Sequence, residues 1–500
     1  MDADNKDYKK SPAGTSVGGS VLGTPEATAV NAPEKRQELY AKRVKVFPRR
    51  VYGTFRMIKW AVMGVLLSIY YLLPWARWDR GHDVPSQAVL FDLPTRRGYI
   101  FDIEIWAQEV YYATGLLILA AFILFLMTSV AGRIWCGYAC PQTVWTDLFV
   151  HIERWIEGDR NQRMKLDKAK WSFGKIIKRV TKHILWVIVS VLTGGAFVFY
   201  FADAPTLAPQ LINGSAPMTS YLFILVLAGT TYLLGGIARE QVCTYMCPWP
   251  RIQGALIDDH TLLVSYNKDR GEPRGKHKKA ETWDGRGDCI SCLQCVAVCP
   301  MGIDIRDGFQ LECIQCALCV DACNSIMKKV DRPPSLISYM SHHQEAAGGI
   351  KLQKTEVFRP RTIIYIVLIG LVSAIMMGSL VTRADIDINI LKDRNPLYVM
   401  LSDGRVRNGY TVNLMNKVHS MRPVTISLEG LGGATMRTAF SKESQTLTTV
   451  LHPDMLKSLK IFVVVPKAIG LNSHSFSFII HEEGGTKLLD EDTSFNGPRK

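Results

Sequence analysis

Five stretches of the chain are long and apolar enough to cross a lipid bilayer as helices, and no other feature restricts the possible folds as strongly. A bilayer core takes about 20 helical residues. Only the first stretch carries a charge, Lys59, near its start where a lysine can reach the surface. A chain that is 48% apolar and 21% charged is also unlike a disordered chain or an ordinary soluble enzyme. The expected spans are residues 57–75, 110–132, 184–202, 219–237 and 362–382.

The charges between these spans predict the orientation of the chain. Many basic residues precede the first span, eleven more occupy the loop 133–182, and the loop 203–218 has none. By the positive-inside rule, the N-terminus, the loop 133–182 and residues 238–361 are cytoplasmic, and residues 383–500 lie outside. This topology accounts for the net charge of +14. Nucleic acid is not needed to explain the charge, and the sequence has no motif for binding it.

Eight of the twelve cysteines form two runs with the Cys-x2-Cys-x2-Cys-x3-Cys spacing of bacterial ferredoxins. In such proteins the fourth cysteine of each run ligates the cluster of the other run. Zinc rarely takes eight cysteines so spaced, and a reducing cytoplasm disfavours disulfides. We therefore expect one [4Fe–4S] cluster on Cys289, Cys292, Cys295 and Cys323, and a second on Cys313, Cys316, Cys319 and Cys299.

The other four cysteines form a repeated pattern at the ends of the second and fourth spans. Both copies read Cys-x-Tyr-x-Cys-Pro and are offset by 107 residues, which indicates an internal repeat. The spacing i, i+4 predicts that both sulfurs of a pair lie on one helical face, and that the proline then limits further helix. A soft-metal site, a third cluster, a redox dithiol pair and inert packing all remain open. We call these residues the edge quartet: Cys136, Cys140, Cys243 and Cys247.

Other cofactor sites lack their usual residues. No histidine lies inside an expected span, which argues against a membrane haem held by facing histidines. No G-x-G-x-x-G follows a strand, and there is no Walker A motif. Beyond the last span, short β-like runs with turn residues predict a small β-sandwich without cysteine, which we expect to dock partners. Its expected strands are 397–401, 410–415, 424–428, 460–465 and 475–480, and its scattered histidines are His419, His452, His474 and His481.

These features divide the chain into five regions of different character. The first, rich in small and polar residues, is expected to be a disordered cytoplasmic tail. The regions are the tail (1–40), transmembrane helices one to four with the two Cys-x3-Cys-Pro turns (41–261), the cytoplasmic ferredoxin-like domain (262–350), transmembrane helix five (351–383) and the outer β-sandwich (384–500).

With these motifs in place, the chain resembles the CcoG/FixG/RdxA family, accessory proteins of cytochrome cbb3-type oxidase assembly. The resemblance covers nearly the whole chain after residue 40. It rests on the edge-quartet turns, the two cysteine runs, the fifth span and the terminal domain with Arg407-Asn408-Gly409-Tyr410. It implies a polyferredoxin of the bacterial inner membrane, with its N-terminus and clusters cytoplasmic and an immunoglobulin-like domain in the periplasm. It further implies reduction of Cu(II) to Cu(I) for the copper centre of the oxidase.

The residues suit that implied activity. Soft thiolates favour Cu(I), so binding at the edge quartet is expected to raise the copper potential. We hypothesise that electrons pass from an unidentified donor through the two clusters to copper held by the quartet. The expected partners are copper ions, membrane lipid, oxidase assembly factors or subunits, and copper transporters or chaperones.

Two other functions are compatible with the same motifs. One is a quinol-oxidising membrane ferredoxin that feeds a periplasmic reductase and is indifferent to copper. The other is a non-catalytic assembly factor that binds copper without turnover.

Overall fold

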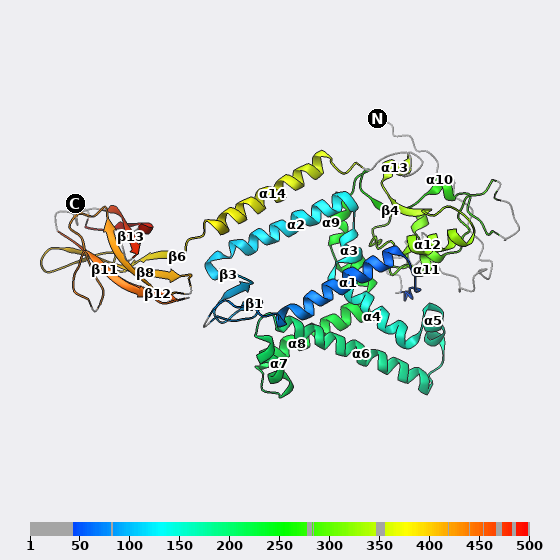
Figure 1. Ribbon diagram of the computed structural model, residues 1–500, viewed down its shortest axis with the longest axis horizontal. Coiled ribbons are helices and arrows are strands. Elements are labelled where there is room, and N and C mark those ends of the chain that lie inside the picture. Colours follow the sequence, from blue (N-terminus) through cyan, green and yellow to red (C-terminus); the bar gives the residue numbers. More distant parts are fainter. Residues whose placement is uncertain are drawn as a thin grey trace. The chain divides into compact units, whose positions relative to one another are not determined.

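A computed structural model describes most of the chain and divides it into two compact units, Met1–Met376 and Met377–Lys500 (Figure 1). The expected tail, residues 1–40, lies outside the described residues. The described residues are 44–81, 84–277, 283, 285–346, 356–418, 420–439, 441–453, 455–466, 473–482 and 487–498.

Five helices in the described part of the chain are long and apolar enough to span a membrane, which confirms the five expected spans. The third begins at Phe173 and not at residue 184, because the Ser172 hydroxyl caps it by accepting a hydrogen bond from the Lys175 N–H at 3.3 Å. The basic first turns therefore extend the helix beyond its apolar run. The spans are Thr54–Trp75 (α1 Thr54–Leu72, η2 Leu73–Trp75), Ala107–Ala131 (η3 Ala107–Glu109, α2 Tyr111–Ala131), Phe173–Val198 (α6), Met218–Ala238 (α8 Met218–Thr231, η4 Tyr232–Ala238) and Pro360–Val381 (α14).

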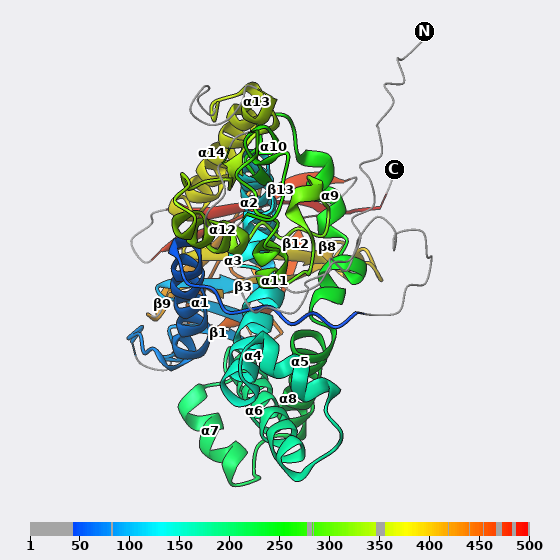
Figure 2. The same cartoon turned by 90° about the vertical axis from the view of Figure 1, so that its right-hand side faces the viewer.

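The basic segment 133–182 is helical, where the sequence indicated a loop. The expectation that the proline of each Cys-x3-Cys-Pro turn limits further helix was wrong. Pro141 occupies the first position of a new helix, where the N–H that proline lacks has no helical partner. Helices α4, α6 and α8 lie side by side (Figure 2). The added helices are α3 (Ile134–Tyr138), α4 (Pro141–Glu157), α5 (Arg160–Lys168) and, after the second turn, α9 (Trp249–Leu256).

The loop between the first two spans contains a small sheet that the sequence did not predict. Strands β1 (Val89–Asp92), β2 (Arg97–Ile100) and β3 (Ile103–Trp106) pair consecutively and antiparallel. Four residues a strand are too few for alternating polarity to stand out in the sequence. The loop between the third and fourth spans carries the short helix α7 (Ala204–Ile212).

The ferredoxin-like domain is closed by two strands far apart in sequence. Strand β4 (Leu263–Tyr266) pairs antiparallel with β5 (Ile337–Met340), and both cysteine runs lie between them in the chain. Helix α11 (Gln294–Val298) begins one residue before the third cysteine of one run, Cys295, and α12 (Leu318–Lys329) begins one residue before the third cysteine of the other, Cys319. The smaller elements nearby are η5 (Val242–Met246), α10 (Lys268–Gly271), η6 (Ile305–Asp307) and α13 (His342–Ala346).

A carboxylate fastens this domain to the first membrane helix. Asp321 of α12 accepts hydrogen bonds from the backbone N–H groups of Phe55 and Arg56, at 3.3 and 2.8 Å, in the first turn of α1. A helix cannot pair these N–H groups itself, and its dipole favours a negative charge there. A Cβ at Gly53 would collide with the Asp321 carboxyl, so the close approach requires glycine.

The side chain of Arg56 extends the same attachment to α4. Its Nη1 atom lies 2.9 Å from both carboxylate oxygens of Asp147, and both side chains are buried. Burial alone would raise the pKa of Asp147, but the positive charges of Lys59 and Arg56 outweigh it and hold the pKa below its ordinary value. Asp147 is therefore ionised at neutral pH.

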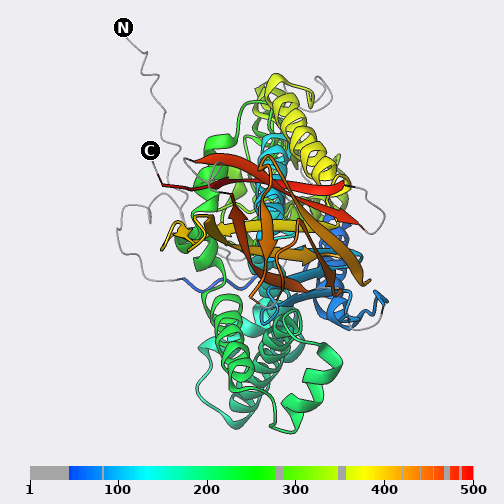
Figure 3. The same ribbon diagram turned by 90° about the vertical axis from the view of Figure 1, so that its left-hand side faces the viewer.

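The second unit is a sandwich of two antiparallel sheets, seen end-on in Figure 3. One sheet has the order β10–β12–β8–β6, with β7 also paired to β8, and the other has the order β11–β9–β13–β14. Tyr410 of β8 is fully buried, and its hydroxyl donates a hydrogen bond to the Ser494 carbonyl at 2.9 Å. The strands are β6 (Ile386–Lys392), β7 (Val399–Met400), β8 (Val406–Asn416), β9 (Arg422–Glu429), β10 (Thr435–Arg437), β11 (Thr446–Leu451), β12 (Leu456–Val465), β13 (His474–Glu482) and β14 (Lys487–Phe495).

The sandwich confirms the expected fold, although the sequence showed only part of it. Every expected strand run overlaps one of β7, β8, β9, β12 and β13. Strands β6, β10, β11 and β14 were missed. Strand β11, for example, alternates only between exposed and partly buried residues until Leu451, so its sequence has little apolar alternation.

Breaking the Arg56–Asp147 pair should destabilise the first unit. Arg56→Met leaves a buried carboxylate without its partner, which typically costs about 3–5 kcal/mol of unfolding free energy. Denaturant titration of the detergent-solubilised chain measures the loss. Adding Asp147→Leu should recover much of it, because no unpaired charge then remains. The control is Lys45→Ala, which breaks the more exposed Lys45–Asp167 pair and should cost under about 1 kcal/mol. Equal losses for Arg56→Met and Lys45→Ala would contradict this assignment.

Candidate metal centre

The eight cysteines of the two runs line two separate cavities, of about 380 and 370 Å³ of empty space. The grouping follows the crossed pattern expected from the spacing, since each cavity takes its fourth cysteine from the other run. Only Cys295 lines both cavities. One cavity contains Cys289, Cys292, Cys295 and Cys323, and the other contains Cys299, Cys313, Cys316 and Cys319.

The two runs share one backbone conformation, repeated after 24 residues. Ser291 and Leu293 in the first run have φ of 52° and 55°, and Gln315 and Ala317 in the second have 55° and 56°. A left-handed residue other than glycine costs about 1–3 kcal/mol, and such strain is typical of functional loops. The turn directs the Gln315 N–H toward the Cys313 sulfur at 3.4 Å. The loops are therefore shaped to present N–H groups to thiolates.

The cavities suit a polynuclear cluster better than a single ion. In the described part of the chain, no three His, Cys, Asp or Glu side chains, those of the edge quartet included, are placed to hold one metal ion as they stand. Zinc would need its sulfurs within about 2.3 Å of the metal, whereas an iron–sulfur cluster bridges thiolates that stand further apart. All eight cysteines are free thiols.

Burial makes a positively charged occupant necessary for these thiolates. It raises the pKa of Cys299 to about 12 and that of Cys313 to about 11, and nearby cysteine charges add to both shifts. Deprotonating such thiols without a cation would leave buried negative charge, which is costly. Cluster iron supplies the compensating charge. Cavity size, donor type and burial therefore all fit two [4Fe–4S] clusters.

The edge quartet comes together from two helix ends. Cys136 lies within α3, Cys140 is the residue before α4, Cys243 lies in η5 and Cys247 follows η5. Burial raises the pKa of Cys243 to about 12, with further contributions from Cys140 and Cys136 of the other turn. The sulfurs of the two turns are thus within electrostatic reach of each other. The members of a pair do not share one helix, because each helix is interrupted between its two cysteines.

The edge quartet lies directly against the second cavity. Cys136 belongs to one apolar cluster with Cys316, and Cys243 and Cys319 pack against that cluster. A Cβ on Gly137 would lie 2.7 Å from the Ile314 carbonyl oxygen, so only glycine allows α3 to approach the second run this closely.

Two hydrogen bonds hold the same contact, and a third joins α3 to α9. The Tyr138 hydroxyl donates to the Cys316 carbonyl at 3.2 Å, and the Arg133 N–H donates to Gln315 Oε1 at 2.9 Å. The Cys136 thiol donates to Oε1 of the fully buried Gln253 at 3.2 Å.

Sequence reasoning missed Gly137, Arg133, Gln253 and Gln315. The glycine is part of the first turn but is replaced by Thr244 in the second. The repeat therefore did not identify this position as important. Gln253 follows the second turn by six residues without any recognisable motif. Only the folded contact with Cys136 identifies it.

A layer of buried charges lies beside the quartet. Glu153 forms ion pairs with Arg163 and Arg239 at 3.0 Å and with Lys182 at 3.4 Å. Burial alone would raise the pKa of Glu153, but Arg239, Arg163 and Lys182 lower it to about 2. Many of the basic residues that indicated a cytoplasmic loop are therefore structural partners of carboxylates.

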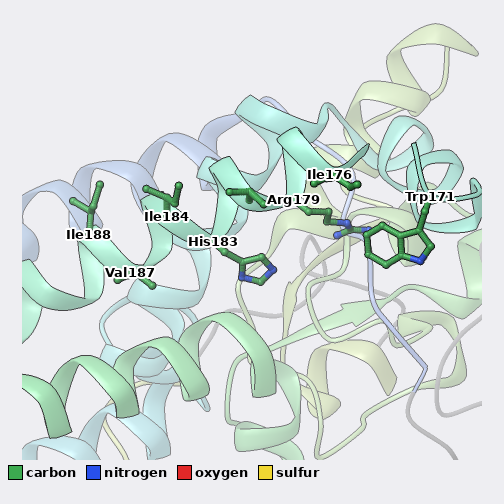
Figure 4. A pocket seen from close by; sticks show the side chains of 8 residues that line it. Trp171, Ile176, Arg179, His183, Ile184, Val187 and Ile188 are labelled. Carbon is green, nitrogen blue, oxygen red and sulfur yellow. The ribbon is translucent and has the colours of Figure 1, made fainter. Parts of the chain in front are cut away.

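An apolar groove runs along α6, with Arg179 and His183 midway along it (Figure 4). The Tyr232 hydroxyl and His183 Nδ1 are 2.8 Å apart. Arg179 and His183 also line a second pocket, which contains Arg239 and Glu240. Arg239 and Glu240 in turn line a third pocket that reaches Cys243. The groove is lined by Trp171, Ile176, Arg179, Val180, His183, Ile184, Val187 and Ile188.

Three sequence families match parts of the chain. Residues 238–342 match a 4Fe-4S dicluster domain, residues 112–158 match a 4Fe-4S binding domain, and residues 376–498 match the IG-like fold at the C-terminus of FixG. The segment 112–158 contains Cys136 and Cys140 but no other cysteine.

Curated relatives match the chain over most of its length. The nitrogen fixation protein FixG of Rhizobium meliloti is 48% identical, covering 95% of this chain and 95% of its own. Protein RdxB of Cereibacter sphaeroides is 48% identical, covering 92% of this chain and 97% of its own. Protein RdxA of the same organism is 50% identical, covering 79% and 85%.

Alkylation of the chain by iodoacetamide near neutral pH should distinguish the cysteines of the edge quartet. Cys247 is exposed, whereas Cys243 is shielded and its pKa is about 12. The thiolate is the reactive form, so Cys243 should react at least about a hundredfold more slowly. Mass spectrometry of digested peptides gives both rates, and raising the pH should accelerate Cys243 steeply. Unfolding in denaturant is the control and should equalise the two. Equal rates in the folded chain would refute the geometry.

Proposed function

The chain belongs to the FixG/RdxA/RdxB family of membrane iron–sulfur redox proteins, and we propose that it is a cupric reductase that supplies Cu(I) for the copper centre of a cbb3-type oxidase. The observation that carries the proposal is the packing of two edge-quartet cysteines, Cys136 and Cys243, in one apolar cluster with cysteines of the second cavity. The proposed location is the bacterial inner membrane. The N-terminus and the ferredoxin-like domain face the cytoplasm, and the β-sandwich faces the periplasm, in agreement with the loop charges.

The eight cysteines of the two runs are the proposed cluster ligands. Each [4Fe–4S] cluster, when bound, would take up and release one electron at a time. The chain buries the thiolates, directs N–H groups such as that of Gln315 toward them, and fills the space around them with apolar side chains. The first cluster takes Cys289, Cys292, Cys295 and Cys323, and the second takes Cys313, Cys316, Cys319 and Cys299.

The edge quartet is the proposed copper site. Each turnover adds one electron to one Cu(II) ion and yields one Cu(I) ion, with no proton or bond transferred. Soft thiolates stabilise the reduced ion, which favours the reduction. Gln253 positions the Cys136 sulfur, and the exposed Cys247 faces the side from which copper can enter. The contact of α3 with the second run keeps copper close to the electron source.

Replacing quartet cysteines should stop copper reduction without removing the clusters. We expect Cys136→Ser and Cys247→Ser to lower dithionite-driven, multiple-turnover Cu(II) reduction by about a hundredfold or more, because a soft ligand is lost. The visible absorbance and EPR signals of the clusters should be unchanged. Met246→Leu, at the exposed neighbour of Cys247, is the matched control and should reduce copper normally. Normal turnover in both serine variants would remove the quartet from the mechanism.

The non-catalytic alternative, a copper-binding assembly factor, differs in the same assay. Such a protein would bind Cu(I) at the quartet but would never convert more than a stoichiometric amount of Cu(II).

A second candidate function, quinol oxidation, is favoured by the α6 groove. The groove is lined by apolar side chains along the membrane helix, with Arg179 and His183 midway along it, which suits a lipid-soluble ring with an isoprenoid tail. The pocket beyond it is lined by both cations and carboxylates, which suits a neutral head. Oxidising one quinol releases two electrons and two protons. The clusters would take the electrons, and His183, whose Nδ1 faces Tyr232, would accept a proton at Nε2.

Quinol oxidation in this groove predicts a selective defect. His183→Phe should slow cluster reduction by a water-soluble menaquinol analogue about tenfold or more, because the proton acceptor is lost. Reduction by dithionite should be unaffected. Leu192→Ala changes an exposed α6 residue outside the groove and is the control. Anaerobic stopped-flow absorbance measures these rates. Failure of quinol to reduce even the unmodified chain would exclude this function.

A further inference from the structure

One end of the β-sandwich gathers two exposed methionines and a histidine. Met421 precedes β9, His452 follows β11, and Met455 precedes β12. Met421 is 64% and Met455 56% exposed, and His452 is also exposed. All three side chains are therefore accessible to a ligand from solvent.

The strand register brings the three residues to the same place. Arg422 of β9 pairs with Leu451 of β11, so the next residues outward from that pair are Met421 and His452. On the other sheet, Leu456 of β12 pairs with Met415 of β8.

A buried amide joins these two pairs across the sandwich. The Asn416 side chain is fully buried, and its Nδ2 donates hydrogen bonds to the Ser420 and His452 carbonyls at 2.8 and 3.3 Å. The Asn416 N–H donates to the Met455 carbonyl at 3.4 Å. Asn416 thus bonds to the backbone of three places in the chain: His452, Met455 and Ser420, which precedes Met421. These bonds bring the backbone of the three residues together at one end of the sandwich.

Two cations near this end are paired with carboxylates. Lys417 lies 3.9 Å from Asp387, and Arg422 lies 3.1 Å from Asp385. A third, Lys457, donates to the Val450 carbonyl at 2.9 Å. The pairing of Lys417 and Arg422 weakens their repulsion of a monovalent cation. The chain from α14 also enters the sandwich here, since the Asp385 carbonyl accepts the Lys417 N–H at 2.9 Å.

We propose that Met421, His452 and Met455 form a Cu(I)-binding site on the β-sandwich. Two thioethers and an imidazole are soft and borderline donors, which favour Cu(I) over Cu(II) and over hard cations. No electron is transferred at this site, because it binds an ion that is already reduced. Its use as a receiving site for copper leaving the chain rests on the proposed reductase function, but binding itself does not.

Methyl spectra of the full-length chain test the site directly. The chain carries ¹³C-methyl methionine and the changes Cys136→Ser and Cys243→Ser, so that the edge quartet does not compete. Cu(I) is added anaerobically from a buffered chelator complex. The Met421 and Met455 signals should shift together and saturate at about one Cu(I) per chain. The control is Met400, 55% exposed on β7 at the other end of β8. It should not shift.

Substitution at the site gives an independent readout. Met421→Leu and Met455→Leu keep the size of the side chain but remove the sulfur, and each should weaken Cu(I) binding by about tenfold or more. Met400→Leu should leave it unchanged. Unmoved Met421 and Met455 signals, or equal effects of all three leucine variants, would overturn the proposal. Neither result depends on Cu(II) reduction, so loss of this site and failure of the reductase function are separable.

Discussion

The contact between helix α3 and the second cysteine run is the interaction on which the rest of the site depends. Gly137 allows the backbone of one membrane-edge turn to lie against Ile314, and Tyr138 bonds to the carbonyl of Cys316, a proposed cluster ligand. Without this contact the edge quartet and the ferredoxin-like domain would be separate features of one chain. With it, the proposed copper site and the proposed second cluster site share one apolar cluster.

Buried charge maintains that contact from the other side of the domain. Asp321 caps the first membrane helix, and Arg56 reaches from that helix to Asp147. Glu153 forms ion pairs with three further cations, from α5, α6 and the segment after η4. Because unpaired buried charges are so costly, these pairs fix the domain against the helices in one arrangement. The basic residues that set the expected topology therefore also build the membrane-edge structure.

Local sequence patterns predicted much of the fold, and the rest depends on contacts between residues far apart in the chain. Runs of apolar residues were sufficient for the five spans, and the ferredoxin spacing grouped eight cysteines as the two cavities do. Pro141 was misread because proline both ends helices and begins them, and only its position relative to Cys140 decides which. The roles of Gln253 and Asp321 could not be predicted from the sequence, because their partners lie 117 and 265 residues away and no motif marks them.

Metal analysis of anaerobically purified protein, combined with EPR before and after addition of Cu(II), tests the central claim most directly. The account predicts about eight iron atoms per chain and two reduced [4Fe–4S] signals. Two Cu(II) ions per chain, one for each cluster, should oxidise both clusters. The Cu(II) EPR signal should disappear as Cu(I) forms. Protein without iron would contradict the claim that the eight cysteines hold two clusters. About twelve iron atoms per chain would place a third cluster on the edge quartet and exclude copper from it.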